Sequence, residues 1–495
     1  MLAGTGDSLA AADDDSALPS SDPRNHREAA PDVDSDRWRE GEQDEFSSLR
    51  DEYHVFHAGD CSEVPADAKV FGCRFVYRCK KDRTAASQRP GVNFRETFAL
   101  VAKFTSIRVL LALAAHGKMH IHQADVDKAY LHGELDEELY MRIPEGIDDP
   151  ALAGKVLKLD GALYGLKQAG CVWNHRIHAT LAHLGYTRMR SDACINVRRT
   201  GGVAHYIALY VNDLLFVSPS LDEITRIKTG LNEVYKIKDL GKARFILGIQ
   251  IHRPTDSGVF LSQCAYLEDV LLRLSQAGCR TAPIPMIPLS QLRAAPEDHT
   301  PSPLFRHRYL QAVGSLMYAM LGTRPDLAHA VGVLGRHANR PDDLHWAAAV
   351  RVCQYLKGTL NYGIKYVPDD APLVGFEAYS DSDWGACVDT ARSTMDYAFV
   401  LASGAVSWLS KLQRRVWPSS TEAEYLGLLH ALKEAVFLRQ LLGELGTSPP
   451  VPLPSSATTR ALTRSPAMPN STIAPATFSS WNALSASRSS RASSQ

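Results

Sequence analysis

Two pairs of carboxylates with the same spacing are the first candidates for chemistry. Asp125 and Asp127 stand two residues apart in QADVDKAY, and Asp381 and Asp383 stand two residues apart in YSDSDW. On a β-strand, residues at this spacing project from one face. Mg²⁺ prefers oxygen ligands, and phosphoryl transfer by two metal ions needs several carboxylates close together. Taken alone, the first pair is explained more simply by a solvated strand face.

Two further acids lie where such a site would need them. The stretch IALYVNDLLFVS predicts two apolar strands with Asp213 at the tip of the hairpin, although a type I′ Asn-Asp turn needs no chemistry. Glu424, in SSTEAEYLGLL, falls in the first turn of a helix that we expect at about 420–445. Thr421 and Glu424 have the spacing of a capping box, which explains Glu424 without catalysis.

Composition and other motifs exclude several classes of protein. The 54 basic and 55 acidic residues nearly cancel, so a nucleic-acid partner would have to be held by a local basic surface. The nine scattered cysteines and the absence of an apolar span predict an intracellular protein without a membrane partner. No histidine group has zinc-finger spacing, and no Walker, dinucleotide-binding or GxSxG motif occurs.

The elements that would position these acids alternate between helix and strand. Helical SIRVLLALAAHGK precedes strand-like MHIHQADVDKAY and HYIALYV, a mixed pattern. Residues 306–359 predict a run of helices broken at Gly and Pro, and a second mixed region begins near LVGFEAYSDSDW. The helix at 420–445 stops at Gly446, and one of its faces carries Tyr425, Leu428, Leu429, Leu432 and Val436.

Taken in order, eight segments resemble the reverse transcriptase and ribonuclease H region of copia-type LTR retrotransposon Pol polyproteins. They include RPGVNFRETFALVAKFTSIRVLLALAA, ALYGLKQAGCVWN, YLQAVGSLMYAMLGTRPDLAHAV and the acid-bearing stretches above. They span about 38–446 and keep the family's order. The chain is thereby identified as a fragment of such a polyprotein.

The resemblance implies an α+β fold with five regions. These are a disordered acidic segment at 1–36, polymerase fingers and palm at 37–250, a largely helical thumb or connection at 251–372, an incomplete ribonuclease H-like domain at 373–446 and a disordered tail at 447–495. It implies Mg²⁺, or Mn²⁺, as cofactor, and an RNA template, a DNA primer and dNTP as partners. In the family, the protein works in a cytoplasmic virus-like particle.

The resemblance also assigns roles to residues of this chain. Asp125 and Asp213 match metal-binding acids of the palm, and Asp381 and Glu424 match acids of the ribonuclease H metal site. Gln168 and Tyr210 match residues that line the incoming nucleotide. Asn212 stands where the family has the first Asp of its YVDD turn, so one carboxylate is lost.

Other departures from the family sequence also indicate a loss of activity. Within CKKDRTAASQRPGVNF the basic strand usual in the fingers is missing, Cys171 replaces a usual Arg, and Asp396 replaces a Gly, which we expect to strain its strand. The tail lacks the DNQ strand that the resemblance implies, and we hypothesise a frameshift near 447–456. We therefore expect an inactive enzyme. The alternatives are an active reverse transcriptase and a non-enzymatic remnant that binds nucleic acid through Lys128, Lys155 and Lys167.

Overall fold

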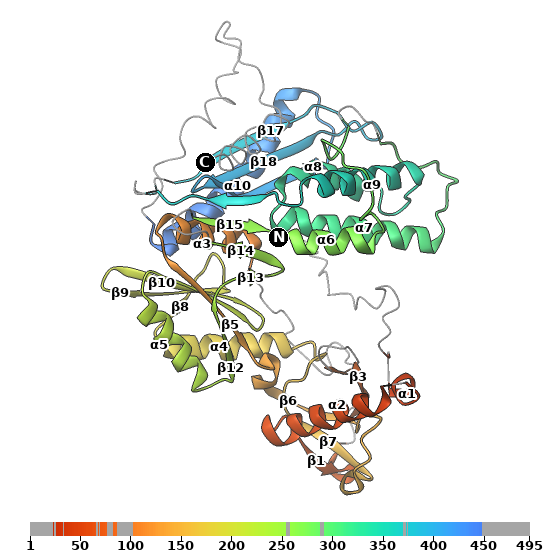
Figure 1. Ribbon diagram of the computed structural model, residues 1–495, viewed down its shortest axis with the longest axis vertical. Coiled ribbons are helices and arrows are strands. Elements are labelled where there is room, and N and C mark those ends of the chain that lie inside the picture. Colours follow the sequence, from red (N-terminus) through yellow and green to blue (C-terminus); the bar gives the residue numbers. More distant parts are fainter. Residues whose placement is uncertain are drawn as a thin grey trace, which may run out of the picture. The chain divides into compact units, whose positions relative to one another are not determined.

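The computed structural model describes residues 23, 26–32, 34–65, 68, 70–76, 83–86, 102–253, 258–287, 292–369, 373 and 375–447 (Figure 1). The chain divides into two compact units. The first unit comprises Met1–Val101 and Val126–Leu184, and the second comprises Ala102–Asp125 and Gly185–Gln495. Both units combine helices with mainly antiparallel sheets, which confirms the α+β fold class.

The first unit is built on a four-stranded sheet in the order β1-β7-β6-β2. Its strands are β1 Phe56–Asp60, β2 Val70–Phe71, β6 Glu134–Met141 and β7 Lys155–Gly161. Its α-helices are α1 His26–Ala29, α2 Ser35–Ser47 and α4 Ala169–His183. Phe46 from α2 packs with Phe56, Leu139 and Leu157 from the sheet, so helix and sheet share one core.

Two expectations about this unit concern segments that the structure describes only in part. Helix α1 lies inside the segment expected to be disordered, and its Ala29 is buried. In the segment expected to form the fingers, β3 Cys73–Val76 pairs with β4 Arg83–Ala86 as a two-stranded ladder. The rest of the segment 79–94, where the basic strand is missing, lies outside the described residues. The same holds for the frameshift expected near 447–456, apart from Thr447.

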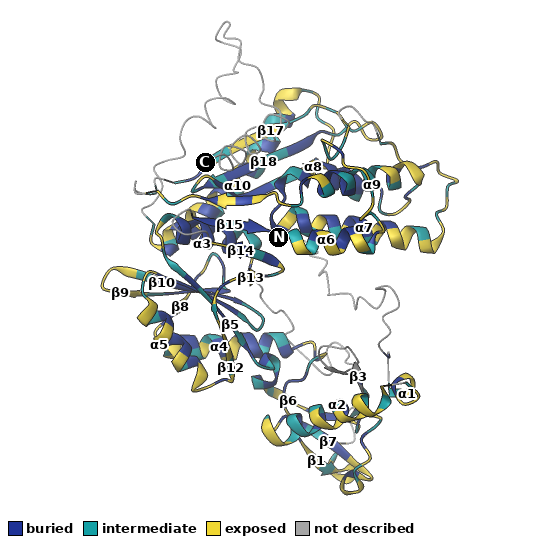
Figure 2. Cartoon of the chain, in the orientation of Figure 1, coloured by how far each residue is buried: buried dark blue, intermediate teal, exposed yellow. Residues whose placement is uncertain are grey.

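The second unit begins with a six-stranded sheet in the order β12-β5-β11-β10-β9-β8. Its strands are β5 His120–Val126, β8 Thr187–Arg188, β9 Ile195–Thr200, β10 Val203–Tyr210, β11 Asp213–Ser218 and β12 Ile237–Lys242. Most of β10 and β11 is buried (Figure 2), because α3 Phe104–His116 and α5 Leu221–Asn232 pack against the sheet. Helix α3 and the central strands lie where the apolar pattern predicts them.

A run of helices follows, as the Gly and Pro breaks predict. The helices are α6 Cys264–Arg273, α7 Pro303–Gly322, α8 Ala328–Arg336 and α9 Asp343–Gly358. They accompany a small sheet of β13 Phe245–Ile246, β14 Ile249–His252, β15 Val259–Ser262 and β16 Gly363–Tyr366. Tyr309, Leu316, Leu334 and Leu356 are at the centre of the helical core.

The C-terminal part is a three-stranded antiparallel sheet covered by one long helix. The strands are β17 Glu377–Ser382, β18 Thr394–Leu401 and β19 Gly404–Leu412, and the helix is α10 Ser420–Leu445. Gly446 ends α10 in the left-handed conformation (φ 85°), as predicted. The helix first buries small residues, Ala423, Gly427, Ala431 and Ala435, and then leucines from Leu438 onward, whereas the predicted apolar stripe at Tyr425 and Leu429 is exposed.

The six-stranded sheet, the helical run and the C-terminal sheet are joined at Arg108 of α3. Its buried guanidinium donates to the carbonyl oxygens of Leu321 and Gly322, at the end of α7, and of Val406 on β19. It also stacks on the ring of Trp408, 4.0 Å from its centroid. The expected domain boundaries at 250 and 372 therefore both fall inside one compact unit. Among the described residues, no helix is both long and apolar enough to cross a membrane.

Candidate active site

The hairpin of β10 and β11 is tighter than the sequence indicates. Tyr210 pairs with Asp213, so Val211 and Asn212 are the two turn residues and Asp213 already belongs to β11. The alternative of an Asn-Asp turn is therefore wrong. Val211 has a φ of 57°, which a β-branched residue adopts only at a cost in backbone strain. The loop is held in an unfavourable conformation directly beside the candidate acids.

The register between β5 and β11 places Asp125 directly opposite Asp213. Opposed residues of an antiparallel pair have Cα atoms about 4.5–5.5 Å apart, so the two carboxylates meet at one end of the sheet. Both residues are half-buried. Asp125, Asn212 and Asp213 thus come together from two strands and their turn.

Each of these two carboxylates accepts a hydrogen bond from a neutral amide. Asn212 Nδ2 donates to Asp125 Oδ1, and Gln123 Nε2 donates to Asp213 Oδ1 over 3.4 Å. Sequence reasoning missed Gln123, which is buried on β5. Its position two residues before Asp125 was the available signal, because that spacing puts both side chains on one strand face.

Asp127 does not share the strand face of Asp125, so this expectation is wrong. β5 ends at Val126, and Asp127 accepts a hydrogen bond from Tyr53 Oη at 2.7 Å. Burial, followed by the nearby Asp127 carboxylate, raises the pKa of Tyr53, so the phenol remains a donor. Asp127 is thereby held within the first unit.

The two residues expected to line the nucleotide belong to different units. Gln168 is buried in the first unit, directly before α4. Tyr210 is half-buried at the end of β10 in the second unit, close to Tyr318. Cys171, the residue that replaces a usual Arg, is buried in α4.

The second acidic cluster forms on the C-terminal sheet. Asp381 of β17 lies directly opposite Asp396 of β18. Burial, together with the neighbouring Asp381 and Asp383 carboxylates, raises the pKa of Asp396 to about 6. Asp396 is not among the described residues with positive φ, so the expectation that it strains its strand is wrong.

Asp383 has a structural role. β17 ends at Ser382, and Asp383 Oδ1 accepts hydrogen bonds from the backbone N–H groups of Thr394 (2.8 Å) and Ala386 (3.4 Å). The buried Gln413, which sequence reasoning missed, donates from Nε2 to Ser382 Oγ and to the Ala423 carbonyl, both at 2.9 Å. These bonds tie the end of β17 to the start of α10.

Glu424 does not take part in the cap of α10. Ser419 is the N-cap: its Oγ accepts from the Glu422 N–H at 3.3 Å and donates to the Glu422 carboxylate at 3.0 Å. The capping box predicted at Thr421 and Glu424 is therefore wrong by two residues. Gly427, one turn after Glu424, packs against the backbone of Asp381, so Glu424 lies near that strand.

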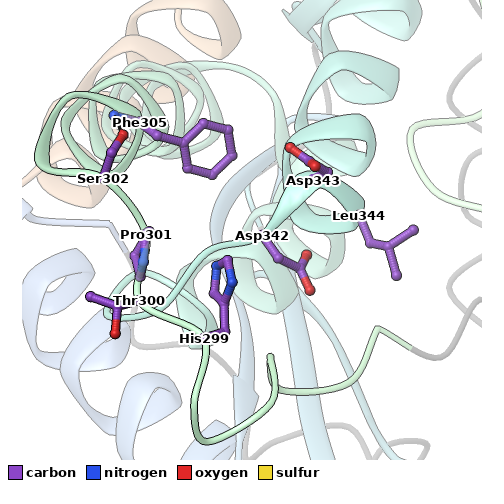
Figure 3. Close-up of a pocket in the computed structure, with 8 residues that line it drawn as sticks. All are labelled: His299, Thr300, Pro301, Ser302, Phe305, Asp342, Asp343 and Leu344. Atoms are coloured by element: carbon purple, nitrogen blue, oxygen red, sulfur yellow. Dashed lines mark hydrogen bonds between the residues drawn. The ribbon is translucent and has the colours of Figure 1, made fainter.

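The described residues also form a pocket of about 470 Å³ where α7 and α9 begin (Figure 3). His299, Phe305 and Asp342 line it, and His299 Nε2 bonds to the Pro341 carbonyl at 2.9 Å. None of the predicted site residues lines this pocket. It is therefore no part of either acidic cluster.

Asp125 and Asp213 are the residues that would hold a metal ion in the first cluster. Across the part of the chain that the structure describes, no three His, Cys, Asp or Glu side chains are arranged to hold one together. Asn212, the third residue of the first cluster, contributes an amide whose N–H faces the Asp125 carboxylate oxygen. The donor set present does not fit a pair of divalent ions.

Comparison with known proteins decides the family. Residues 57–288 match the family model described as reverse transcriptase (RNA-dependent DNA polymerase). The chain is 34% identical over 304 residues to the putative transposon Ty5-1 protein YCL074W of Saccharomyces cerevisiae, covering 61% of this chain and 97% of that protein. The chain belongs to the copia-type retrotransposon reverse transcriptases. Members of this family generally use divalent metal ions.

The copia-type relatives include much longer proteins. Over 402 residues, 78% of the chain, it is 36% identical to the retrovirus-related Pol polyprotein from transposon TNT 1-94 of Nicotiana tabacum. The match spans 30% of that polyprotein's length. A foamy viral protease-reverse transcriptase in complex with dsDNA shares 12% identity and a TM-score of 0.39, with 88% of this chain and 94% of that one covered. That likeness adds nothing to the assignment.

Proposed function

We propose that this chain is a copia-type reverse transcriptase and ribonuclease H fragment that no longer polymerises DNA. The observation that carries the proposal is the hydrogen bond from the Asn212 amide to Asp125. The fragment retains the fingers and palm, a helical connection and part of a ribonuclease H-like domain. Its ancestral partners are an RNA template, a DNA primer and dNTP, with Mg²⁺ or Mn²⁺ as cofactor.

Charge is the physical reason for the loss of activity. A site that holds two divalent ions beside a triphosphate depends on anionic ligands, and an amide supplies none. The alternative orientation of the Asn212 side chain would place its carbonyl oxygen against the Asp125 carboxylate, which is repulsive. The amide N–H therefore faces Asp125 and occupies an oxygen that a metal ion would need.

Primer extension on an RNA template tests the proposal. With Mg²⁺ or Mn²⁺, we expect no detectable extension by the protein as it stands and clear extension by Asn212→Asp. The difference in rate should be at least about 100-fold, which corresponds to about 2.7 kcal/mol of barrier because each 1.36 kcal/mol is tenfold in rate. Asn361→Asp, on the surface of the same unit, is the matched control and should behave like the parent.

Each outcome separates one part of the proposal. Extension by the unaltered protein overturns it. If neither protein extends, inactivity stands but Asn212 is not the deciding lesion, and the fingers segment at 79–94 becomes the next one to restore. Tighter Mn²⁺ binding by Asn212→Asp, followed by electron paramagnetic resonance, is the readout that does not depend on turnover.

For the C-terminal sheet we infer a remnant of a ribonuclease H site built on Asp381 and Glu424. The adjacent Asp396 supports this inference, because its carboxylate faces Asp381 across the sheet. We expect no cleavage of an RNA–DNA hybrid by the chain. Cleavage that Asp381→Asn abolishes would show that the C-terminal site still works.

A further inference from the structure

An apolar stripe on the long helix α10 faces solvent. The α10 stripe consists of Tyr425, Leu429, Leu432 and Val436, each of which is 36–52% exposed. Helix α10 packs on β17 and β18 with a different face, so the stripe takes no part in that core. Exposed apolar side chains that lie side by side and are rimmed by polar ones mark interaction surfaces.

The spacing of the α10 stripe is that of a coiled-coil seam. Its successive members stand four, three and four residues apart along the helix. This alternation is the a/d pattern with a mean period of 3.5 residues, which two helices share when they pack side by side. The face that a helix buries on a globular core is broader. The stripe therefore has the shape that fits a second helix.

The α10 stripe is complementary to a reversed copy of itself. When two α10 helices run antiparallel with a twofold axis between Leu429 and Leu432, Leu429 meets the partner's Leu432. In the same register, Tyr425 meets the partner's Val436, because these residues lie equally far from the axis. A large ring thus lies against a smaller side chain at each end, and two leucine pairs lie between them. An interface around a twofold axis uses the same surface of both copies in this way.

Two charges extend this symmetry beyond the apolar residues. Glu422 stands three residues before Tyr425, Arg439 stands three residues after Val436, and both are exposed. The antiparallel register places Glu422 opposite the partner's Arg439 at both ends of the seam. A parallel pair would instead bring glutamate against glutamate and arginine against arginine, which is repulsive. The charges therefore favour a second copy of this chain, in the antiparallel orientation.

We propose that the α10 stripe is the interface of a homodimer in which two α10 helices pack antiparallel. The interaction needs neither Asp125 nor Asp381, so it goes beyond the proposed function. The seam from Glu422 to Arg439 is about 26 Å long at 1.5 Å per residue. An interface of one helix from each copy is small, so the dimer is a weak one, with a dissociation constant of about 10 μM.

Sedimentation equilibrium of the full chain, from about 1 to about 100 μM, tests the proposal. Leu429→Glu should raise the dissociation constant at least about tenfold, because the twofold axis introduces the buried charge twice. Leu272→Glu is the matched control: it changes a leucine of α6 that is 69% exposed, and it should dimerise like the parent. Circular dichroism checks that both variants are folded.

A charge exchange tests the orientation. Arg439→Glu should raise the dissociation constant about fivefold, because it faces Glu422 of the partner subunit at both ends. Adding Glu422→Arg to Arg439→Glu restores opposite charges in the antiparallel register and should return the dissociation constant to within about threefold of the parent. A double variant as weak as Arg439→Glu alone would overturn the antiparallel arrangement.

Two other results would overturn the interface itself. One is a dimer that Leu429→Glu and Leu272→Glu affect equally, which would place the contact elsewhere on the chain. The other is a parent that stays monomeric at about 100 μM. If that monomer dimerises once Phe478→Ser and Trp481→Ser are introduced, the C-terminal segment of the same chain covers the α10 stripe instead of a second copy.

Discussion

Replacing Arg108 by Met should destabilise the whole second unit. The buried guanidinium donates hydrogen bonds to three carbonyl groups, those of Leu321, Gly322 and Val406. Leu321 and Gly322 end α7, where helix carbonyls have no intrahelical partner. Val406 is the extra residue of a β-bulge, since Phe399 pairs with Ser407 and Val400 pairs with Ala405. Met has a similar length but donates no hydrogen bond.

The size of the effect follows from these contacts. An unsatisfied buried polar group costs about 1–3 kcal/mol, so two to three orphaned carbonyls predict a loss of about 4 kcal/mol in the free energy of unfolding. Loss of the contact with Trp408 acts in the same direction. Arg108→Lys keeps the charge but cannot reach all three acceptors, and it should fall between the parent and Arg108→Met.

Urea unfolding followed by circular dichroism and tryptophan fluorescence measures this loss. Arg273→Met removes an exposed pair with Asp269 and should cost less than about 1 kcal/mol. A loss below about 1 kcal/mol in Arg108→Met would refute the reasoning. So would a parent protein whose C-terminal sheet unfolds in a separate transition, because Arg108 would then not couple the parts.

Two further predictions concern pH and helix capping. His337 is 7% exposed and stacks on His345 with ring centroids 4.0 Å apart, and burial lowers its pKa to about 4. Folding favours the neutral imidazole, so the stability that His337 contributes is fully present above pH 6.5 and falls by about 3 kcal/mol as the pH drops toward 4. His337→Phe should therefore remove most of the pH dependence of the urea midpoint in this range. Ser419→Ala should lower the free energy of unfolding, measured by thermal unfolding, by about 1 kcal/mol, whereas Thr421→Ala should leave it nearly unchanged. The reverse order would show that Thr421 is the N-cap.

The sequence predicted those elements whose signals are local. Helix α3, the hairpin around Asn212 and the end of α10 at Gly446 follow from apolar periodicity and turn residues. The buried face of the first part of α10 does not, because close packing on β17 leaves room there only for small residues such as Gly427. Apolar periodicity indicates that a helix has an apolar face, but packing against the neighbouring element decides which face is buried.

The acids of the candidate site could be predicted from the sequence, whereas their hydrogen bonds could not. Asp125 and Asp213 follow from motif and spacing, and their opposition depends on strand register. The bonds from Gln123 and Asn212 depend on that register and on the turn type, neither of which the residue types alone determine. Arg108, a charge within an apolar helix, would have been predicted to face solvent.

The hydrogen bond of Asn212 also predicts what restoring the carboxylate should cost. Asn212→Asp replaces an attractive contact with Asp125 by a third carboxylate beside Asp125 and Asp213. Without a divalent ion, the loss of the bond and the added repulsion should lower the free energy of unfolding by about 1–2 kcal/mol. Millimolar Mn²⁺ should reverse that loss in Asn212→Asp and leave the parent unchanged, because only the variant has the charge to bind the ion. A variant that is as stable as the parent in EDTA would mean that the amide does not hold Asp125 in solution. Parent and variant measured side by side therefore separate a residue retained for stability from one required for catalysis.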